Sequence, residues 1–307
     1  MLQNVFTVGT QVVILFVLIA VGFGANKAKI INDKTVAGMT DLILYIVTPC
    51  VIINSYQREF DPAMLKALII AAAASIASFA LNIVIAHLAI RDKDKRREKV
   101  LRMGVVFSNC GYMSLPLQSA LLGSEGVFYG ATYVALFNIV LWTYGAAVMS
   151  GDVRSISMKK ILFNPGIIGT VFGVGLFISS VALPSVIREP ISYLAALNTP
   201  IPMMIIGYRL ASASLKIKGF NAYLAMFLRL IATPLIFLLG LYMFGIGGAL
   251  AVSLTVAVSA PCAAATTMFS EKFGGDTSLS AAMVSVTTII SVITMPLIVG
   301  LASLISS

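Results

Sequence analysis

The sequence predicts an all-α integral membrane protein with ten transmembrane helices, arranged as two inverted five-helix repeats. Composition is the first reason: 59% of the 307 residues are hydrophobic and 11% are charged, whereas a soluble domain carries roughly 25% charged residues. The second is a series of long apolar segments, and the third is a set of prolines that recurs in both halves of the chain. Together these observations exclude an ordinary soluble fold.

Ten apolar segments are long enough to cross a bilayer, which takes about 20 residues in a helix. Several contain Pro or Gly, so the boundaries of these spans are approximate. We expect spans at residues 5–25, 36–57, 63–90, 100–122, 126–149, 165–183, 190–211, 219–244, 248–270 and 278–304.

Lysine and arginine are distributed unevenly between the loops. Every second loop is basic, with the longest run in "RDKDKRREK", while the loops between hold only Arg58, Lys66 and Arg188. Basic loops stay in the cytoplasm, so we expect a multi-pass protein of the cell membrane with both termini outside. Orientation in the bilayer thus explains the basic excess, and we expect lipid rather than nucleic acid as the partner.

The two halves of the chain resemble each other weakly. Pro49 in the second span corresponds to Pro200 in the seventh, and Pro116 in the fourth corresponds to Pro261 in the ninth. Because five spans are an odd number, two such halves must insert with opposite orientation, as in many secondary transporters. We expect the repeats to be residues 1–152 and 153–307.

Two matched interruptions, Ser108–Pro116 and Ser259–Cys262, are the candidate functional site. Irregular backbone persists at membrane depth only where protein buries it or water meets it. An inverted repeat would bring both breaks to the midplane, where they can cross. We expect Pro116 and Pro261 each to begin a second half-helix, with Ser114 and Ser259 as N-caps. Helix N-termini carry positive partial charge, so the site suits an anion; the alternative is that the prolines are ordinary kinks.

Other polar residues within the spans allow several interpretations. No Asp or Glu lies in the middle of a span, which argues against a cation–proton antiporter. Arg229 is interpreted as snorkelling to the cytoplasmic interface, with a counterion role as the alternative. Asn138 is either helix–helix glue or a ligand contact. Sodium could be held by hydroxyls such as Thr287 or Thr288, and neither a metal site nor a cofactor is indicated.

The motifs "NCGYMSLPL", "FNPGIIGTVFGVGL", "SAPCAAATTMF" and "VSVTTIISVITMPL" resemble the auxin efflux carrier family, in its compact prokaryotic form related to malate and malonate permeases. This fold group also includes bile acid/sodium symporters. The resemblance implies crossed, broken helices four and nine and an elevator motion. Helices 1, 2, 6 and 7 would form a dimeric scaffold, and helices 3–5 and 8–10 would carry substrate. It places a substrate-site asparagine at Asn109 and crossing prolines at Pro116 and Pro261. The ninth-helix asparagine of the plant carriers has no counterpart here, which argues against an auxin-like substrate.

These patterns predict a secondary active transporter of a small organic anion, one with a carboxylate, with Na⁺ or H⁺ as the candidate coupling ion. A membrane sensor that binds a similar anion, an auxin-like indole carboxylate carrier and a channel are the rival hypotheses. An enzyme is not expected, because no nucleophile and base pair is evident. The expected substrate-site residues are Ser108, Asn109, Cys110, Gly111, Pro116, Asn138, Ser259, Pro261 and Cys262.

Overall fold

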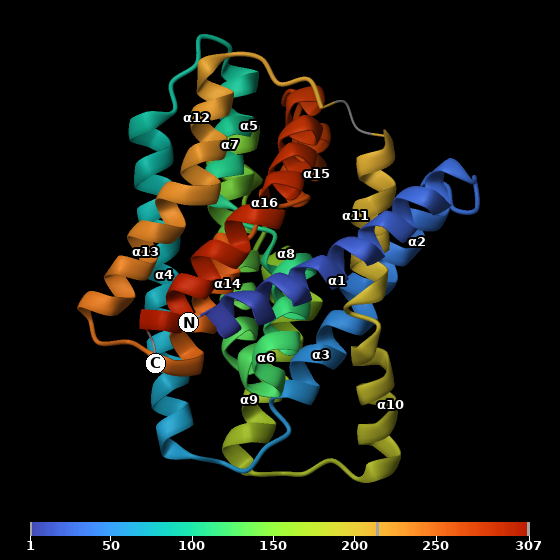
Figure 1. The fold of residues 1–307 in the computed structure, drawn as a ribbon, viewed down its shortest axis with the longest axis vertical. Helices are drawn as coiled ribbons and strands as arrows, with labels where there is room; N and C mark the ends of the chain where they lie inside the picture. Colours follow the sequence, from blue (N-terminus) through green and yellow to red (C-terminus); the bar gives the residue numbers. More distant parts are fainter. Residues whose placement is uncertain (1, 213–214, 306–307) are drawn as a thin grey trace.

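The protein is an all-helical membrane protein. The computed structural model describes residues 2–212 and 215–305, and in these ranges one isolated pair of residues, Ser108 and Cys262, is the only β-type pairing. Figure 1 shows α2, α10 and α11 on one side of the bundle and α4, α12 and α13 on the other, with α1 running across the middle. The outermost residues of the two expected repeats, 1 and 306–307, lie outside the described residues.

The helices follow one another along the chain with short connections. In order they are α1 (Leu2–Lys27), α2 (Asp33–Leu42), η1 (Ile43–Val47), α3 (Thr48–Ser55), α4 (Pro62–Ala89), α5 (Lys95–Val106), η2 (Cys110–Ser114), α6 (Leu115–Val140), η3 (Leu141–Gly145), α7 (Ala146–Ser150), η4 (Val153–Ser155), α8 (Met158–Leu162), α9 (Pro165–Ser179), α10 (Ser185–Ala196), α11 (Pro200–Ser212), α12 (Phe220–Phe227), η5 (Leu228–Ala232), α13 (Thr233–Met243), α14 (Gly248–Ser259), α15 (Ala265–Phe273) and α16 (Thr277–Ile305).

Seven helical stretches among the described residues are long and apolar enough to cross a membrane, and a bent pair, α8 with α9, would make eight. The ten expected spans are therefore not confirmed by helix length. The difference has two physical causes. α14 has 12 residues and α15 has 9, so the interrupted ninth span contains no single helix of sufficient length. In addition, Cys110–Ser150 counts as one stretch although it contains two expected spans, 100–122 and 126–149. The presence of ten transmembrane spans therefore stays a prediction.

The chain reverses direction at Gly123, inside the long stretch Cys110–Ser150. Gly123 has φ 62° and ψ −148°, which is not helical. In a straight helix, residues 118 and 130 would be about 18 Å apart. Here a Cβ added to Gly130 would lie 2.0 Å from Oε1 of Gln118. The stretch is therefore a tight hairpin of two helical segments, and its turn falls between the expected spans 100–122 and 126–149.

Three of the helices widen into a π-turn just before a proline. The π-turns η1, η2 and η5 end two residues before Pro49, Pro116 and Pro234. Proline has no N–H, and its ring clashes with the carbonyl four residues earlier. A π-turn moves that carbonyl aside and lets the helix continue. Each of these prolines therefore bends a span without ending it.

Helices α1 and α11 pack backbone to backbone. A Cβ at Gly22 would lie 2.2 Å from the Met204 carbonyl oxygen, and one at Gly207 would lie 1.9 Å from that of Ile19. Only glycine allows this approach, as is common between helices in membranes. Elsewhere in the bundle, Gly169 of α9 packs against Pro49 and Gly173 packs against Tyr56. Close glycine contacts therefore join α1 to α11 and α3 to α9.

Several of the basic loops share one end of the bundle. Arg96 donates to the carbonyl of Gly274 (3.1 Å) and Arg97 donates to that of Lys218 (2.9 Å). Lys99 donates to the carbonyl of Met149 (3.1 Å). The loops that the charge pattern assigns to a single face therefore contact one another.

Candidate functional site

The two chain breaks meet and pair in antiparallel fashion. The N–H of Asn109 donates to the carbonyl of Pro261 (2.8 Å), and the N–H of Ala263 donates to that of Phe107 (2.9 Å). Ser108 and Cys262 lie opposite each other between these bonds. Each break thus satisfies backbone groups of the other, which is what irregular backbone needs at this depth. We call this paired region, residues 107–109 and 260–264, the crossing.

The crossing begins where the local sequence leaves the helical conformation. Ala260 has φ −62° and ψ 150°, because a residue before proline avoids the helical region. Phe107 is extended, with φ −103° and ψ 112°. Pro261 lacks an N–H but contributes its carbonyl, so it fits a pairing that uses only its acceptor.

The half-helices do not start at the prolines, contrary to expectation. Helical backbone resumes at Cys110, and Pro116 lies in a continuous helix beyond the π-turn. α15 starts only at Ala265, four residues after Pro261. The reason is that the pairing of the two breaks, rather than either proline, sets where each helix resumes.

The expected serine caps are also wrong. The Ser114 hydroxyl donates to the carbonyl of Val256 in α14 (3.2 Å). Ser259 is the last residue of α14, and its hydroxyl turns back to the same carbonyl (3.3 Å). Both serines therefore stabilise the helix entering the crossing from the second half, and neither caps a helix that leaves it.

Free space lies beside the first turn of η2. The side chain of Asn109 does not cap the helix that follows, and the residue keeps 6% of its surface exposed. A Cβ added to Gly111 would meet no atom within 4 Å, so there is free space beside the first turn. The first N–H groups of a helix have no partner within it. Donors and space thus coincide where Asn109 and Gly111 were expected to bind substrate.

Buried hydrogen bonds fasten the crossing to its neighbours. The N–H of Cys262 donates to Oγ1 of Thr287 in α16 (3.1 Å). The Gln118 amide donates to the carbonyl of Ser253 (2.8 Å), and the Ser253 hydroxyl donates to that of Gly126 (2.7 Å). The hydrogen bonds of Gln118 and Ser253 could not be predicted from the sequence, because the sequence does not indicate which backbone carbonyl a polar side chain in α6 or α14 will contact.

Arg229 does not snorkel, and this corrects the sequence interpretation. Its side chain is fully buried. Nη1 donates to the carbonyls of Val105 (2.9 Å) and Val106 (3.4 Å), and Nη2 donates to that of Val258. These are the last carbonyls of α5 and α14, which have no partner within their helices. Arg229 therefore joins the two helices that enter the crossing.

The other expected residues occupy different places. Cys110 and Cys262 are buried free thiols. The amide of Asn138 donates to Val134 of its own helix (2.9 Å) and accepts from Asn164 (3.1 Å), so it joins α6 to the start of α9. The Thr288 hydroxyl donates to Val284 within α16 (2.7 Å). In the described ranges, no group of three His, Cys, Asp or Glu side chains could hold a metal ion.

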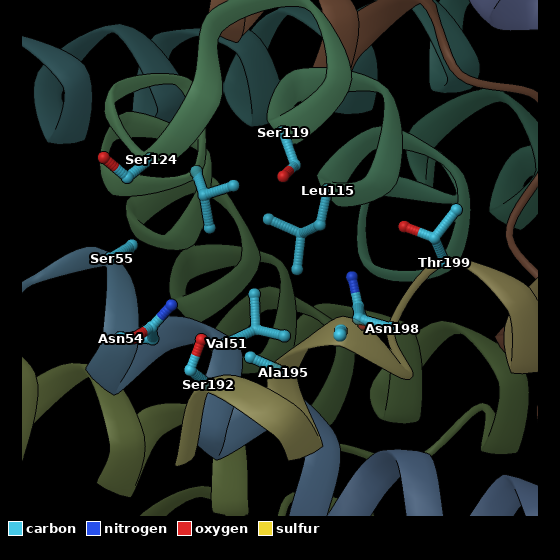
Figure 2. A pocket seen from close by; sticks show the side chains of 12 residues that line it. Val51, Asn54, Ser55, Leu115, Ser119, Ser124, Ser192, Ala195, Asn198 and Thr199 are labelled. Atoms are coloured by element: carbon cyan, nitrogen blue, oxygen red, sulfur yellow. The ribbon is translucent and has the colours of Figure 1, made fainter. Parts of the chain in front are cut away.

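A partly polar pocket lies between α3, α6 and α10. Figure 2 shows side chains from α3, α6 and α10 and from the turn between α10 and α11 around a cavity of about 280 Å³. Its wall includes Leu115, about one turn beyond the start of η2. The Asn198 Oδ1 atom is buried without a hydrogen-bond partner. The remaining lining residues are Val51, Asn54, Ser55, Ser119, Ser124, Val127, Ser192, Ala195, Ala196 and Thr199.

Comparison with known proteins agrees with this architecture. The family described as "Membrane transport protein" matches residues 7–155 and 151–299. An uncharacterized transporter of Methanothermobacter thermautotrophicus is 24% identical over 95% of this chain and 98% of its own length. Another, of Methanocaldococcus jannaschii, is 22% identical over 93% of this chain and 96% of its own. The family and these relatives are transporters rather than enzymes, and the matches extend over nearly the whole sequence. This chain belongs to the membrane transport protein family.

Proposed function

We propose that this protein is a secondary active transporter that moves a small organic anion, a carboxylate, across the cell membrane. The observation that carries the proposal is that two helices, η2 and α15, both start at the crossing. Each helix N-terminus is equivalent to roughly +0.5 elementary charge, so the pair offers about one unit of positive charge. That matches one carboxylate group, and backbone N–H groups are suitable donors to it.

In this proposal Asn109 donates a hydrogen bond to the carboxylate, and Gly111 leaves room for it. Ser108, Cys110, Ser259, Pro261 and Cys262 form the wall behind it; Ser108, Ser259 and Cys262 are fully buried and Cys110 almost so. The pocket between α3, α6 and α10 would be the route by which the anion reaches the crossing, since its wall includes Leu115, on the half-helix that starts at the crossing.

We further propose that the chain has ten transmembrane spans in two inverted repeats. The reversal at Gly123 divides one long stretch into two passes. The antiparallel pairing of the breaks is the relation that inverted repeats produce. The scaffold and dimer surface would be α1–α3 and α9–α11, and α4–α7 and α12–α16 would move with the site in an elevator step. The shared end of the basic loops would face the cytoplasm, with both termini outside.

Two other functions make different predictions. A membrane sensor would bind the same anion without moving it. An indole carboxylate carrier would prefer a larger, aromatic anion, whereas the single amide at the crossing favours a smaller one.

The test uses purified protein in liposomes. Uptake of radiolabelled malate, malonate and indole-3-acetate would be recorded under an imposed potential, pH gradient or sodium gradient. We expect saturable uptake of a small dicarboxylate. Binding without uptake would support the sensor, and preferred uptake of indole-3-acetate would support the indole carrier.

A further inference from the structure

The central charge of the crossing is an arginine without an acidic partner. None of the ion pairs of the described residues includes Arg229. The ionisable side chains that face it are Tyr133, Cys110 and Cys262. A fully buried cation with no counter-charge would be strongly unfavourable. Something else in the crossing must therefore balance it.

The balance comes from the ends of two helices. α5 ends at Val106 and α14 at Ser259, and each C-terminus is equivalent to roughly −0.5 elementary charge. Arg229 donates to the terminal carbonyls of both. Two C-termini therefore neutralise one guanidinium, and its planar fork can reach both helices at once.

This neutralisation changes the charge seen by a ligand. Four helix ends meet at the crossing: two negative C-termini and the two positive N-termini of η2 and α15. Without Arg229 their partial charges would cancel. With Arg229 the C-termini are balanced, and the N-termini leave about one positive charge unbalanced.

Arg229 also occupies the acceptors that a coupling cation would need. Hard cations bind oxygen atoms, and the carbonyls of Val105, Val106 and Val258 already receive the guanidinium. Oγ1 of Thr287 receives the N–H of Cys262 and donates to Met283 (2.7 Å). These carbonyls and Oγ1 of Thr287 are thus engaged within the protein, whereas the buried hydroxyl of Ser108 has no hydrogen-bond partner among the described residues.

We propose that Arg229 is a cation built into the crossing: it holds the two entering helices together and gives the site the net positive charge that selects an anion. It is a positioning residue, since it acts on the substrate through the helix ends. The inference rests on the proposed function for its anion, and it implies that sodium is bound neither by the carbonyls that Arg229 occupies nor by Oγ1 of Thr287.

Arg229→Gln, Arg229→Lys and Arg229→Ala test the proposal, with exposed Arg209→Gln as the matched control. Thermal stability is measured first, since it needs no substrate. We expect Arg229→Ala to lower Tm by several degrees, and guanidinium chloride at about 20 mM, far below denaturing concentrations, to restore part of the loss. Wild type and Arg209→Gln should gain nothing from guanidinium. If guanidinium changed the Tm of all three proteins equally, Arg229 would not be holding the two entering helices together, and the proposal would be overturned.

The second measurement addresses charge. The KM for the anion that the liposome assay identifies should rise about tenfold or more in Arg229→Gln, with a smaller rise in Arg229→Lys because the charge is kept. Any sodium dependence of wild-type uptake should persist in Thr287→Val. An unchanged KM in Arg229→Gln, or sodium-driven uptake in wild type that Thr287→Val abolishes, would overturn the proposal. Absence of uptake in every protein would instead contradict the proposed function. The stability test would then still decide whether Arg229 holds the two entering helices together.

Discussion

Replacing Thr287 by Val should destabilise the protein by leaving one buried N–H without an acceptor. Oγ1 of Thr287 is fully buried and accepts from the N–H of Cys262 at 3.1 Å. Valine keeps the branched shape but has no oxygen. A buried donor that loses its partner costs about 1–3 kcal/mol. We therefore expect the free energy of unfolding to fall by that amount.

Thr288→Val is the matched control. The Thr288 hydroxyl donates to Val284 (2.7 Å), as that of Thr287 donates to Met283 (2.7 Å), and both residues are buried. Since these bonds to the same helix are equivalent, the difference between the variants isolates the Cys262 N–H. The assay is reversible unfolding of purified protein in mixed micelles. We expect Thr288→Val within about 0.5 kcal/mol of wild type; equal losses in both variants would refute the anchoring of the crossing by α16.

Two further predictions concern packing and charge. Gly207→Ala should lower Tm and expression, because its Cβ would lie 1.9 Å from the Ile19 carbonyl oxygen, whereas Gly24→Ala, which has open space, should be neutral or stabilising; similar behaviour of both in a thermal-shift assay would contradict the close approach of α1 and α11. Glu98→Gln should cost about 1.5–3 kcal/mol, because this buried carboxylate pairs with Lys95 (2.5 Å) and Arg102, whereas Glu189→Gln in an exposed pair should change nothing measurable by the same unfolding assay.

The sequence predicted the meeting of the two breaks because its signals are local and repeated. Asn109 and Gly111 are unfavourable within an apolar helix, and the second break lies at the matched place in the other half. Unpaired backbone N–H and C=O groups are unfavourable inside a membrane, so the two interrupted segments need hydrogen-bond partners. In the structure they pair with each other.

The role of Arg229 could not be predicted from the sequence. A long cationic side chain in an apolar segment can extend to the interface or stay buried, and the choice depends on acceptors in two other helices, 124 and 29 residues away in the sequence. Those acceptors exist only because α5 and α14 end side by side. The same reason explains why the predicted starts of the second half-helices were wrong. The preference of proline for the first turn of a helix predicted starts at Pro116 and Pro261, whereas the long-range pairing of the two breaks decides where each helix resumes.

The most direct test of the central claim is the affinity of Asn109→Ala for the transported anion, measured beside Asn26→Ala, whose amide contacts Ser212 at an exposed site. Loss of a hydrogen bond to a charged ligand costs about 1.5–3 kcal/mol, so we expect the affinity to fall about 10- to 100-fold with Tm unchanged, and the control to bind as wild type does. Wild-type affinity in a folded Asn109→Ala would show that the anion binds elsewhere and would contradict the assignment of the crossing as the substrate site.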